Sequence, residues 1–95
     1  MPALFPLFRL GIVLATPAAR ALLESAGVRA ESLLRRHIVG NWSEMSEHDQ
    51  LANAEALTPG EECRVFSRYT TTAGRVWIIT EWDRSMTTIL LPSEY

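Results

Sequence analysis

The C-terminal end of the chain, residues 75–95, constrains the fold more than any other stretch. It contains two runs rich in β-branched and aromatic residues, 75–82 and 86–92, separated by the polar sequence Asp83-Arg84-Ser85. This pattern is typical of a β-hairpin. Both runs are apolar at nearly every position, so both faces of the hairpin should be at least partly covered. The covering layer must come from the segments upstream.

Residues 7–40 predict a strand followed by two helices. Residues 7–15 favour a short strand, added at an edge of the sheet. Thr16-Pro17 then begins a helix, because Thr can cap the helix and Pro is favoured at its first position. Gly27 ends this helix, since Gly adopts the left-handed conformation without strain. A second helix, over about residues 30–38, carries an apolar side and ends at Gly40.

A third helix and another strand lead into the hairpin. Ser46 or Ser43 can cap the third helix, and Leu51, Ala54 and Leu57 give it a thin apolar stripe. Residues 62–69 alternate as a strand, and residues 70–74 turn the chain into the hairpin. We therefore predict one α+β domain over residues 1–95. Three short helices should pack on a three- to four-stranded, mainly antiparallel sheet that ends in a β-meander.

Composition excludes several classes of protein. The 95 residues are 47% hydrophobic and carry a formal net charge of −2, which gives no general attraction to nucleic acid or to acidic membranes. The single Cys63 excludes an internal disulfide; within a predicted strand it indicates a buried thiol and a reducing cytoplasm. The apolar N-terminus lacks a basic region and is interrupted by Pro6 and Arg9, so we expect no signal peptide and no membrane span.

Carboxylates are concentrated between residues 44 and 62, where no Lys or Arg occurs. They are Glu44, Glu47, Asp49, Glu55, Glu61 and Glu62. The simplest interpretation is a solvated helix face. The functional alternative is an acidic patch that imitates nucleic-acid phosphates or docks on a basic groove of a protein partner. The candidate partner-binding residues are Glu44, Glu47, Asp49 and Glu55, together with Arg64, Arg68 and Arg84.

Arginines form a second candidate surface. All nine basic residues are Arg, and Arg64 and Arg68 share a strand face with Phe66 because residues two apart point the same way. We predict that Arg75 and Arg84 join them on this face. Arg beside an aromatic ring on an exposed sheet can stack bases and contact phosphates, so a nucleic-acid-binding regulator is an alternative function.

Two histidines provide the remaining candidates for chemistry. His37 and His48 match no compact metal motif, so we expect no metal and no cofactor. His37 ends the second predicted helix, where a positive side chain would interact favourably with the helix dipole. A small RNase toxin is a further alternative, in which His37, Arg64, Arg68, Tyr69 and Glu81 supply a base, phosphate contacts and an acid.

Other side chains have simpler structural interpretations. Trp42 should anchor its loop on the core. In the hairpin turn, Asp83 should bond its own backbone, and Arg84 should pair with Glu81 or Glu94.

Three motifs resemble a family of short bacterial proteins that are commonly encoded on plasmids and integrated mobile elements. The motifs are an Arg-His-x-x-Gly-x-Trp element at residues 36–42, Ser-x-Tyr at residues 67–69, and the string Thr-Glu-x-Asp-Arg-Ser-x-Thr-Thr-Ile-Leu-Leu-Pro-x-Glu-Tyr at residues 80–95. The family often has Asp where this chain has Asn41, and a small residue where it has Trp82. Some members are labelled as restriction-system methylation subunits, but this chain lacks a Gly-rich cofactor loop and a methyltransferase catalytic motif.

The resemblance implies a small interaction protein without chemistry of its own. We therefore expect a non-enzymatic, cytoplasmic protein from a mobile genetic element that binds a protein partner. It would counter or regulate a nucleic-acid-processing or defence system.

Overall fold

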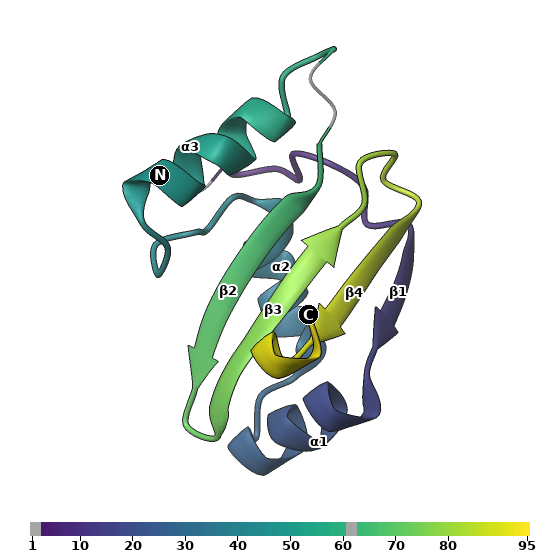
Figure 1. Ribbon diagram of the computed structural model, residues 1–95, viewed down its shortest axis with the longest axis vertical. Coiled ribbons are helices and arrows are strands. Elements are labelled where there is room, and N and C mark those ends of the chain that lie inside the picture. The colour runs from purple at the N-terminus through teal and green to yellow at the C-terminus, as the bar shows by residue number, and fades with distance from the viewer. Residues whose placement is uncertain (1–2, 61–62) are drawn as a thin grey trace.

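The computed structural model describes residues 3–60 and 63–95 and has the element order expected from the sequence (Figure 1). The elements are β1 (Ile12–Ala15), α1 (Pro17–Ala26), α2 (Ala30–Ile38), α3 (Glu47–Ala56), β2 (Val65–Thr71), β3 (Gly74–Thr80), β4 (Met86–Leu90) and a 3₁₀ turn, η1 (Pro92–Glu94). This arrangement confirms the α+β prediction. None of the helices in the described ranges is long and apolar enough to cross a bilayer.

The strands form one four-stranded sheet in the order β1-β4-β3-β2. Strands β2, β3 and β4 make the predicted antiparallel meander, and β1 lies parallel to β4 at the edge. The edge strand is shorter than the predicted 7–15 because Gly11 adopts a left-handed φ of 66° immediately before it. A Cβ at Gly11 would overlap the Ser85 carbonyl oxygen, so only glycine fits this approach.

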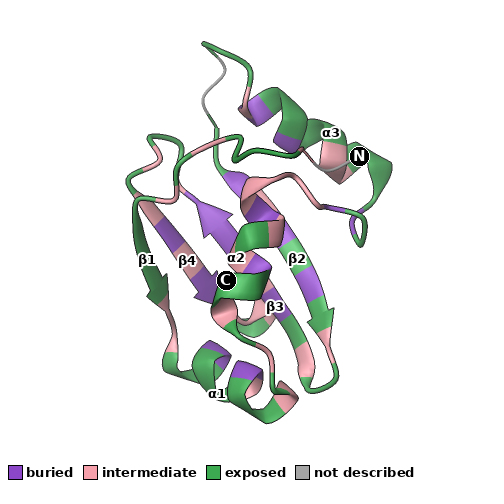
Figure 2. Cartoon of the chain, turned by 180° about the vertical axis from the view of Figure 1, so that it is seen from behind, coloured by how far each residue is buried: buried purple, intermediate pink, exposed green. Residues whose placement is uncertain are grey.

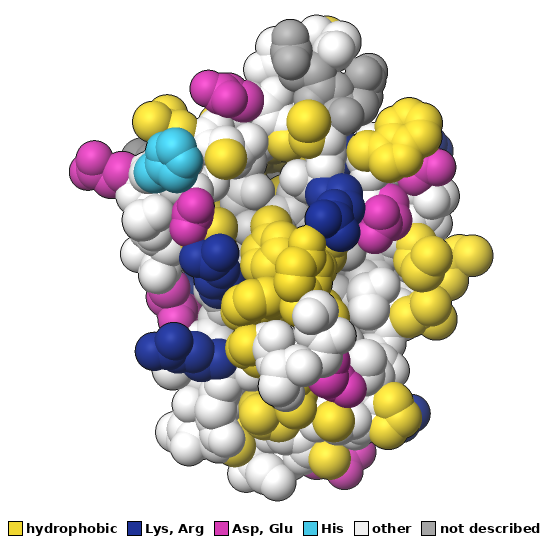
Figure 3. Space-filling model, in the orientation of Figure 1, with side chains coloured by type: hydrophobic (Ala, Val, Ile, Leu, Met, Phe, Trp, Pro, Cys, Tyr) yellow, Lys and Arg dark blue, Asp and Glu magenta, His cyan; other side chains and the backbone are white. Residues whose placement is uncertain are grey.

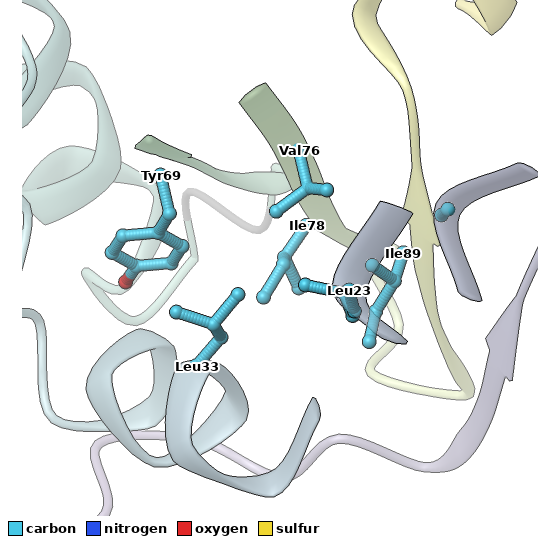
Figure 4. Close-up of a cluster of buried hydrophobic side chains, with 7 residues drawn as sticks. Leu23, Leu33, Tyr69, Val76, Ile78 and Ile89 are labelled. Carbon is cyan, nitrogen blue, oxygen red and sulfur yellow. The ribbon is translucent and has the colours of Figure 1, made fainter. Parts of the chain in front are cut away.

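Helices α1 and α2 cover one face of the sheet, and α3 lies beside β2 (Figures 1 and 2). The main core lies between these two helices and the sheet. It consists of Ala19, Leu23, Leu33, Tyr69, Val76, Ile78 and Ile89 (Figure 4). A second cluster under α3 contains Trp42, Met45, Ala56 and Val65, which confirms Trp42 as a loop anchor. On the opposite face of the sheet, η1 is the one element of the described ranges that crosses the strands (Figure 1).

Both predicted ends of α1 and the predicted start of α3 are confirmed. The Thr16 hydroxyl accepts a hydrogen bond from the Ala19 N–H at 3.1 Å, Pro17 is the first residue of α1, and Gly27 follows the helix with a φ of 67°. Ser46 caps α3 in the same way, accepting from the Asp49 N–H at 3.2 Å. These ends depend on neighbouring residues alone, and for that reason the sequence specifies them well.

Two predictions about burial are wrong. The stripe expected on α3 is not its buried side: Leu51 is 63% exposed, whereas Asn53 and Ala56 are buried. The reason is that α3 packs beside the edge of the sheet through the Asn53 side chain. Cys63 is exposed and lies before β2, which begins at Val65. Residues 61 and 62, part of the predicted strand and acidic segment, lie outside the described ranges.

Candidate binding face of the sheet

The face of the sheet that α1 and α2 leave uncovered carries most of the arginines predicted to lie together. Directly paired residues of β2 and β3 share a face, and Arg68 pairs with Trp77 while Thr70 pairs with Arg75. We call this surface the open face. It consists of Phe66, Arg68, Thr70, Arg75, Trp77 and Tyr95, with Arg64 at its margin.

Three aromatic rings form the centre of the open face. Their centroids lie 4.9 Å apart for Phe66 and Trp77, 5.5 Å for Phe66 and Tyr95, and 5.4 Å for Trp77 and Tyr95, all in edge-to-face geometry. Tyr95 follows η1 and is 62% exposed, whereas Phe66 and Trp77 are half-buried. Figure 3 shows a hydrophobic patch in the middle of this side of the molecule.

Arginine side chains border this aromatic centre (Figure 3). The Arg68 guanidinium lies 5.3 Å from the Phe66 ring centroid and 5.5 Å from that of Trp77. Arg64 lies 5.7 Å from the Tyr95 ring and donates a 2.7 Å hydrogen bond to the Tyr95 phenol oxygen. These contacts agree with the predicted grouping of Arg64 and Arg68 with Phe66, and Arg75 shares the face through its pairing with Thr70.

Two hollows flank Arg68. One, of about 410 Å³, lies between α3 and β2. Both signs of charge line it, from Asp49, Glu55, Arg64 and Arg68, together with apolar groups that include Met45, Ala52 and Phe66. The other hollow, of about 390 Å³, is lined by Glu44, Arg68, Tyr69, Thr70, Arg75, Trp77 and Pro92. The open face therefore offers two receptive sites for side chains.

The predicted acidic residues do not form one free patch. Glu44 accepts a 2.8 Å hydrogen bond from the Thr70 N–H and pairs with Arg36 at 3.3 Å. Asp49 pairs with Arg68 at 2.8 Å. Glu47 and Glu55 remain exposed on α3. Glu44 and Asp49 therefore bind arginines of the protein itself, and Glu44 also binds the backbone of the edge strand β2.

Side chains occupy two positions on the outer edge of β2, at Phe66 and Thr70. The Asn53 carboxamide accepts from the Phe66 N–H at 2.9 Å and donates to the Phe66 carbonyl at 2.7 Å, as a neighbouring strand would. Four residues along the same edge, the Thr70 N–H donates to Glu44. Occupied edge groups disfavour the addition of a further strand. A ligand on this side therefore meets the side chains of the open face.

Arg84 lies away from the open face, contrary to the prediction. Its guanidinium donates to the backbone carbonyls of Ala56, Cys63 and Glu81 at 2.9, 2.7 and 3.1 Å. The predicted pairing with a Glu81 or Glu94 side chain is therefore wrong. Because Ala56 is the last residue of α3, Arg84 links the end of that helix to the β3–β4 turn. Its candidate role as a partner contact has no support in this geometry.

The rest of that turn follows the prediction. Asp83 accepts from the Ser85 N–H at 3.1 Å and from the Ser85 hydroxyl at 2.6 Å. These hydrogen bonds lower the pKa of the Asp83 carboxyl. Trp82, beside it, is 59% exposed.

His37 is fully buried on the helix-covered side of the sheet. Its Nδ1 lies 2.5 Å from the Ser67 hydroxyl and its Nε2 lies 2.8 Å from the Thr80 hydroxyl. Thr80 is bonded at 2.7 Å to Thr87, which donates to the Leu10 carbonyl at 2.7 Å. Because a carbonyl only accepts, each hydrogen bond in this series has a defined direction. Thr80 donates to Thr87, the Nε2–H of His37 donates to Thr80, and Ser67 donates to Nδ1.

The expectation of a charged His37 at the end of α2 is wrong. Burial, and next the positive charge of Arg84, lower the pKa of His37 from 6.5 to about 3. The imidazole is therefore neutral, with one nitrogen donating and the other accepting. Its ring also meets Phe8 edge to face, with centroids 5.0 Å apart.

The residues suggested for RNase chemistry do not meet at one place. His37 lies in the interior, whereas Arg64 and Arg68 are exposed on the open face. Tyr69 is also buried, and its phenol donates to the Asn41 carbonyl at 3.0 Å. Burial raises the pKa of this phenol. Within residues 3–60 and 63–95, no three His, Cys, Asp or Glu side chains gather as a metal site would require.

Sequence reasoning missed Trp77 and Tyr95 as parts of the open face. Trp77 could have been found from the hairpin register, because a turn over residues 72 and 73 places it opposite Arg68. Tyr95 carried no such signal, since its position depends on the fold of η1. Comparison with protein-family models, with curated proteins and with solved structures found no match to the chain. The geometry of the open face is therefore the basis for a proposed function.

Proposed function

We propose that the protein is a small non-enzymatic interaction module that binds a protein partner on its open face. The observation that carries the proposal is the cluster of Phe66, Trp77 and Tyr95 bordered by Arg64 and Arg68 on the face that α1 and α2 leave uncovered. Trp, Tyr and Arg are the residues most enriched where protein interfaces concentrate their binding energy. Because their rings pack on one another, these residues are held in place before a partner arrives.

Two features favour a protein over a nucleic acid. The hollow beside α3 contains the carboxylates of Asp49 and Glu55 next to Arg64, and these negative charges would repel a phosphate backbone. The faces of the Phe66 and Trp77 rings are partly occupied by the Arg68 guanidinium, so little ring surface is free for base stacking. Alternating charge around an apolar centre suits a protein surface.

Nucleic-acid binding is the second candidate, and one observation favours it. Arg64, Arg68 and Arg75 lie with aromatic rings on a single sheet face, as in proteins that bind single strands. Tyr95 is the most exposed of these rings and would be the first to stack on a base.

The family resemblance suggests what kind of partner to look for. It implies a mobile genetic element, and hence a partner from a nucleic-acid-processing or defence system. A protein that binds nucleic acid usually carries a basic surface. The exposed carboxylates Glu47 and Glu55 beside the open face would support contact with such a surface.

The test is affinity capture from a bacterial lysate with and without nuclease. A double variant, Arg64→Glu with Arg75→Glu, reverses charge at two exposed positions of the open face. The matched control is Arg20→Glu, an exposed arginine on α1. Because the substituted side chains are exposed, all these variants should fold like the wild type.

The proposal expects a stoichiometric protein that survives nuclease, is lost with the double variant and is retained by Arg20→Glu. Binding of this protein should then be reproduced with purified components. Recovery that disappears with nuclease would favour the nucleic-acid alternative. Equal capture by wild type and the double variant would remove the open face as the binding surface.

A further inference from the structure

We infer that the partner docks an extended acidic segment along β2 on the open face, with two carboxylates six residues apart and apolar side chains between them. The inference rests on the proposed function and adds to it the chemistry of the partner. It follows from the spacing of the arginines, from the way their charges are compensated and from the occupied edge positions of β2.

The spacing comes from strand geometry. Positions 64, 66, 68 and 70 point to the same side and are separated by about 6.6 Å for each two residues. Arg75 pairs with Thr70, so it stands at the level of position 70. Arg64 and Arg75 therefore mark the ends of a row about 20 Å long. Phe66 and the Arg68–Trp77 pair lie between these ends.

The charges along this row are unequal. Asp49 compensates the central Arg68, and Glu44 is engaged by Arg36 and the Thr70 N–H. Among the described residues, none of the three ion pairs includes Arg64 or Arg75. Both ends of the row therefore carry a positive charge. The middle is aromatic, and Asp49 compensates the charge of Arg68 there. The complementary ligand is negative at its ends and apolar in its middle.

An extended conformation follows from the shape of the surface. Asn53 and Glu44 occupy the edge of β2 at Phe66 and Thr70, which disfavours the addition of a further strand, so we place the ligand across the side chains. The hollows on either side of Arg68 can each accept a side chain. In an extended segment, alternate side chains face the same way, so positions 1, 3, 5 and 7 of a heptapeptide would face the protein.

Three synthetic heptapeptides with blocked ends test this pattern. The first, Glu-Thr-Val-Thr-Val-Thr-Glu, places carboxylates at positions 1 and 7. The second replaces both Glu by Gln. The third, Glu-Thr-Val-Glu-Val-Thr-Thr, keeps the net charge of the first but moves one carboxylate to position 4, which faces away. Binding is followed in ¹⁵N–¹H spectra through the Trp77 indole N–H and the backbone of β2 and β3.

We expect saturable shifts on the open face with the first peptide. The affinity should be about fivefold lower for the second peptide, which loses two exposed ion pairs, and about twofold lower for the third, which loses one. Raising the salt concentration should reduce these differences because exposed charges are screened. Arg75→Gln should weaken binding of the first peptide and leave the Gln peptide unchanged. Arg20→Gln, on the helix-covered side, should change neither.

Several results would overturn the inference. Equal affinity for the first and third peptides would show that net charge alone matters. Absence of saturable binding of the first peptide at millimolar concentration would show that this segment does not fit. A uridine heptamer that binds more tightly than the first peptide would assign the arginine row to nucleic acid. If capture of a protein partner still depends on Arg64 and Arg75 while the peptides fail, only the inferred chemistry falls and the proposed function stands.

Discussion

Acidification should destabilise the protein through His37. Its pKa in the folded state is about 3 because burial and the nearby charge of Arg84 disfavour the imidazolium, whereas its ordinary value is 6.5. The unfolded chain therefore binds a proton at this residue that the folded chain does not. A depressed histidine pKa favours folding in full above pH 6.5, and this contribution is lost as the pH falls from 6.5 toward 3.

The expected magnitude follows from that interval. The free energy of unfolding should fall by about 1.4 kcal/mol for each pH unit below 6.5, the value of one pKa unit. Between pH 7.5 and pH 5.0 the loss from His37 should be about 2 kcal/mol. The lowered pKa values of Asp83 and Glu94 act in the same direction but nearer pH 4, so pH 5.0 limits their contribution. A loss of 2 kcal/mol is a large part of the stability of a small domain.

Urea unfolding followed by tryptophan fluorescence at several pH values between 7.5 and 5.0 measures this loss. His37→Gln removes the titrating group, so this variant should be less stable at pH 7.5 but should lose less stability on acidification than the wild type. His48→Gln is the matched control, because His48 is exposed on α3. This variant should retain the full pH dependence of the wild type.

Two results would refute the reasoning. One is a wild-type protein that loses no more stability than His37→Gln between pH 7.5 and pH 5.0. The other is a charged His37 ring in the wild type at pH 5.0, which can be measured even if the variant does not fold. Nitrogen NMR of the His37 ring should show a neutral imidazole protonated at Nε2 down to pH 5.0, because the hydrogen-bond chain ends at the Leu10 carbonyl. A charged ring at that pH would contradict the argument.

Three further substitutions test how the fold positions the open face, with unfolding in urea as the common measurement. Gly11→Ala should cost clearly more than the roughly 1–2 kcal/mol of a left-handed alanine expected for Gly27→Ala, because a Cβ at Gly11 meets a carbonyl of the β3–β4 turn whereas Gly27 faces open space. Asn53→Ala should cost about 2–3 kcal/mol, since Phe66 loses both backbone hydrogen bonds; light scattering should also detect association through the opened β2 edge. Arg84→Met should cost about 1–3 kcal/mol by removing donors to three carbonyls, and a smaller cost would mean that water replaces them.

Local signals account for what could be predicted. The ends of α1 follow from Thr16-Pro17 and Gly27, all within or next to the helix. The hairpin of β3 and β4 follows from two β-rich runs and a turn containing Asp83, which bonds the adjacent Ser85 as expected. Such features depend on residues a few positions apart, so the sequence determines them before any tertiary contact forms.

Long-range pairing explains what could not be predicted. His37 follows two arginines at a helix end, which indicated a charged position, but its hydrogen-bond partners are 30 and 43 residues away. Arg84 was expected to pair with a nearby carboxylate, and it instead reaches Ala56, 28 residues away. The open face has one feature that could be predicted from the sequence and one that could not. Strand parity predicted Arg64 beside Phe66, whereas the pairing of Arg68 with Asp49 needed the position of α3.

The buried polar chain connects the interior of the domain to its candidate binding surface. Ser67, Thr80 and Thr87 belong to three adjacent strands, and His37 on α2 joins the first two. A buried hydroxyl without a partner is costly, so a slip of β2 along β3 that separates Ser67 from His37 would be disfavoured. The same register places Arg68 opposite Trp77 on the other side of the sheet. Side chains that a partner cannot reach therefore hold the arginine and the aromatic ring together where a partner can.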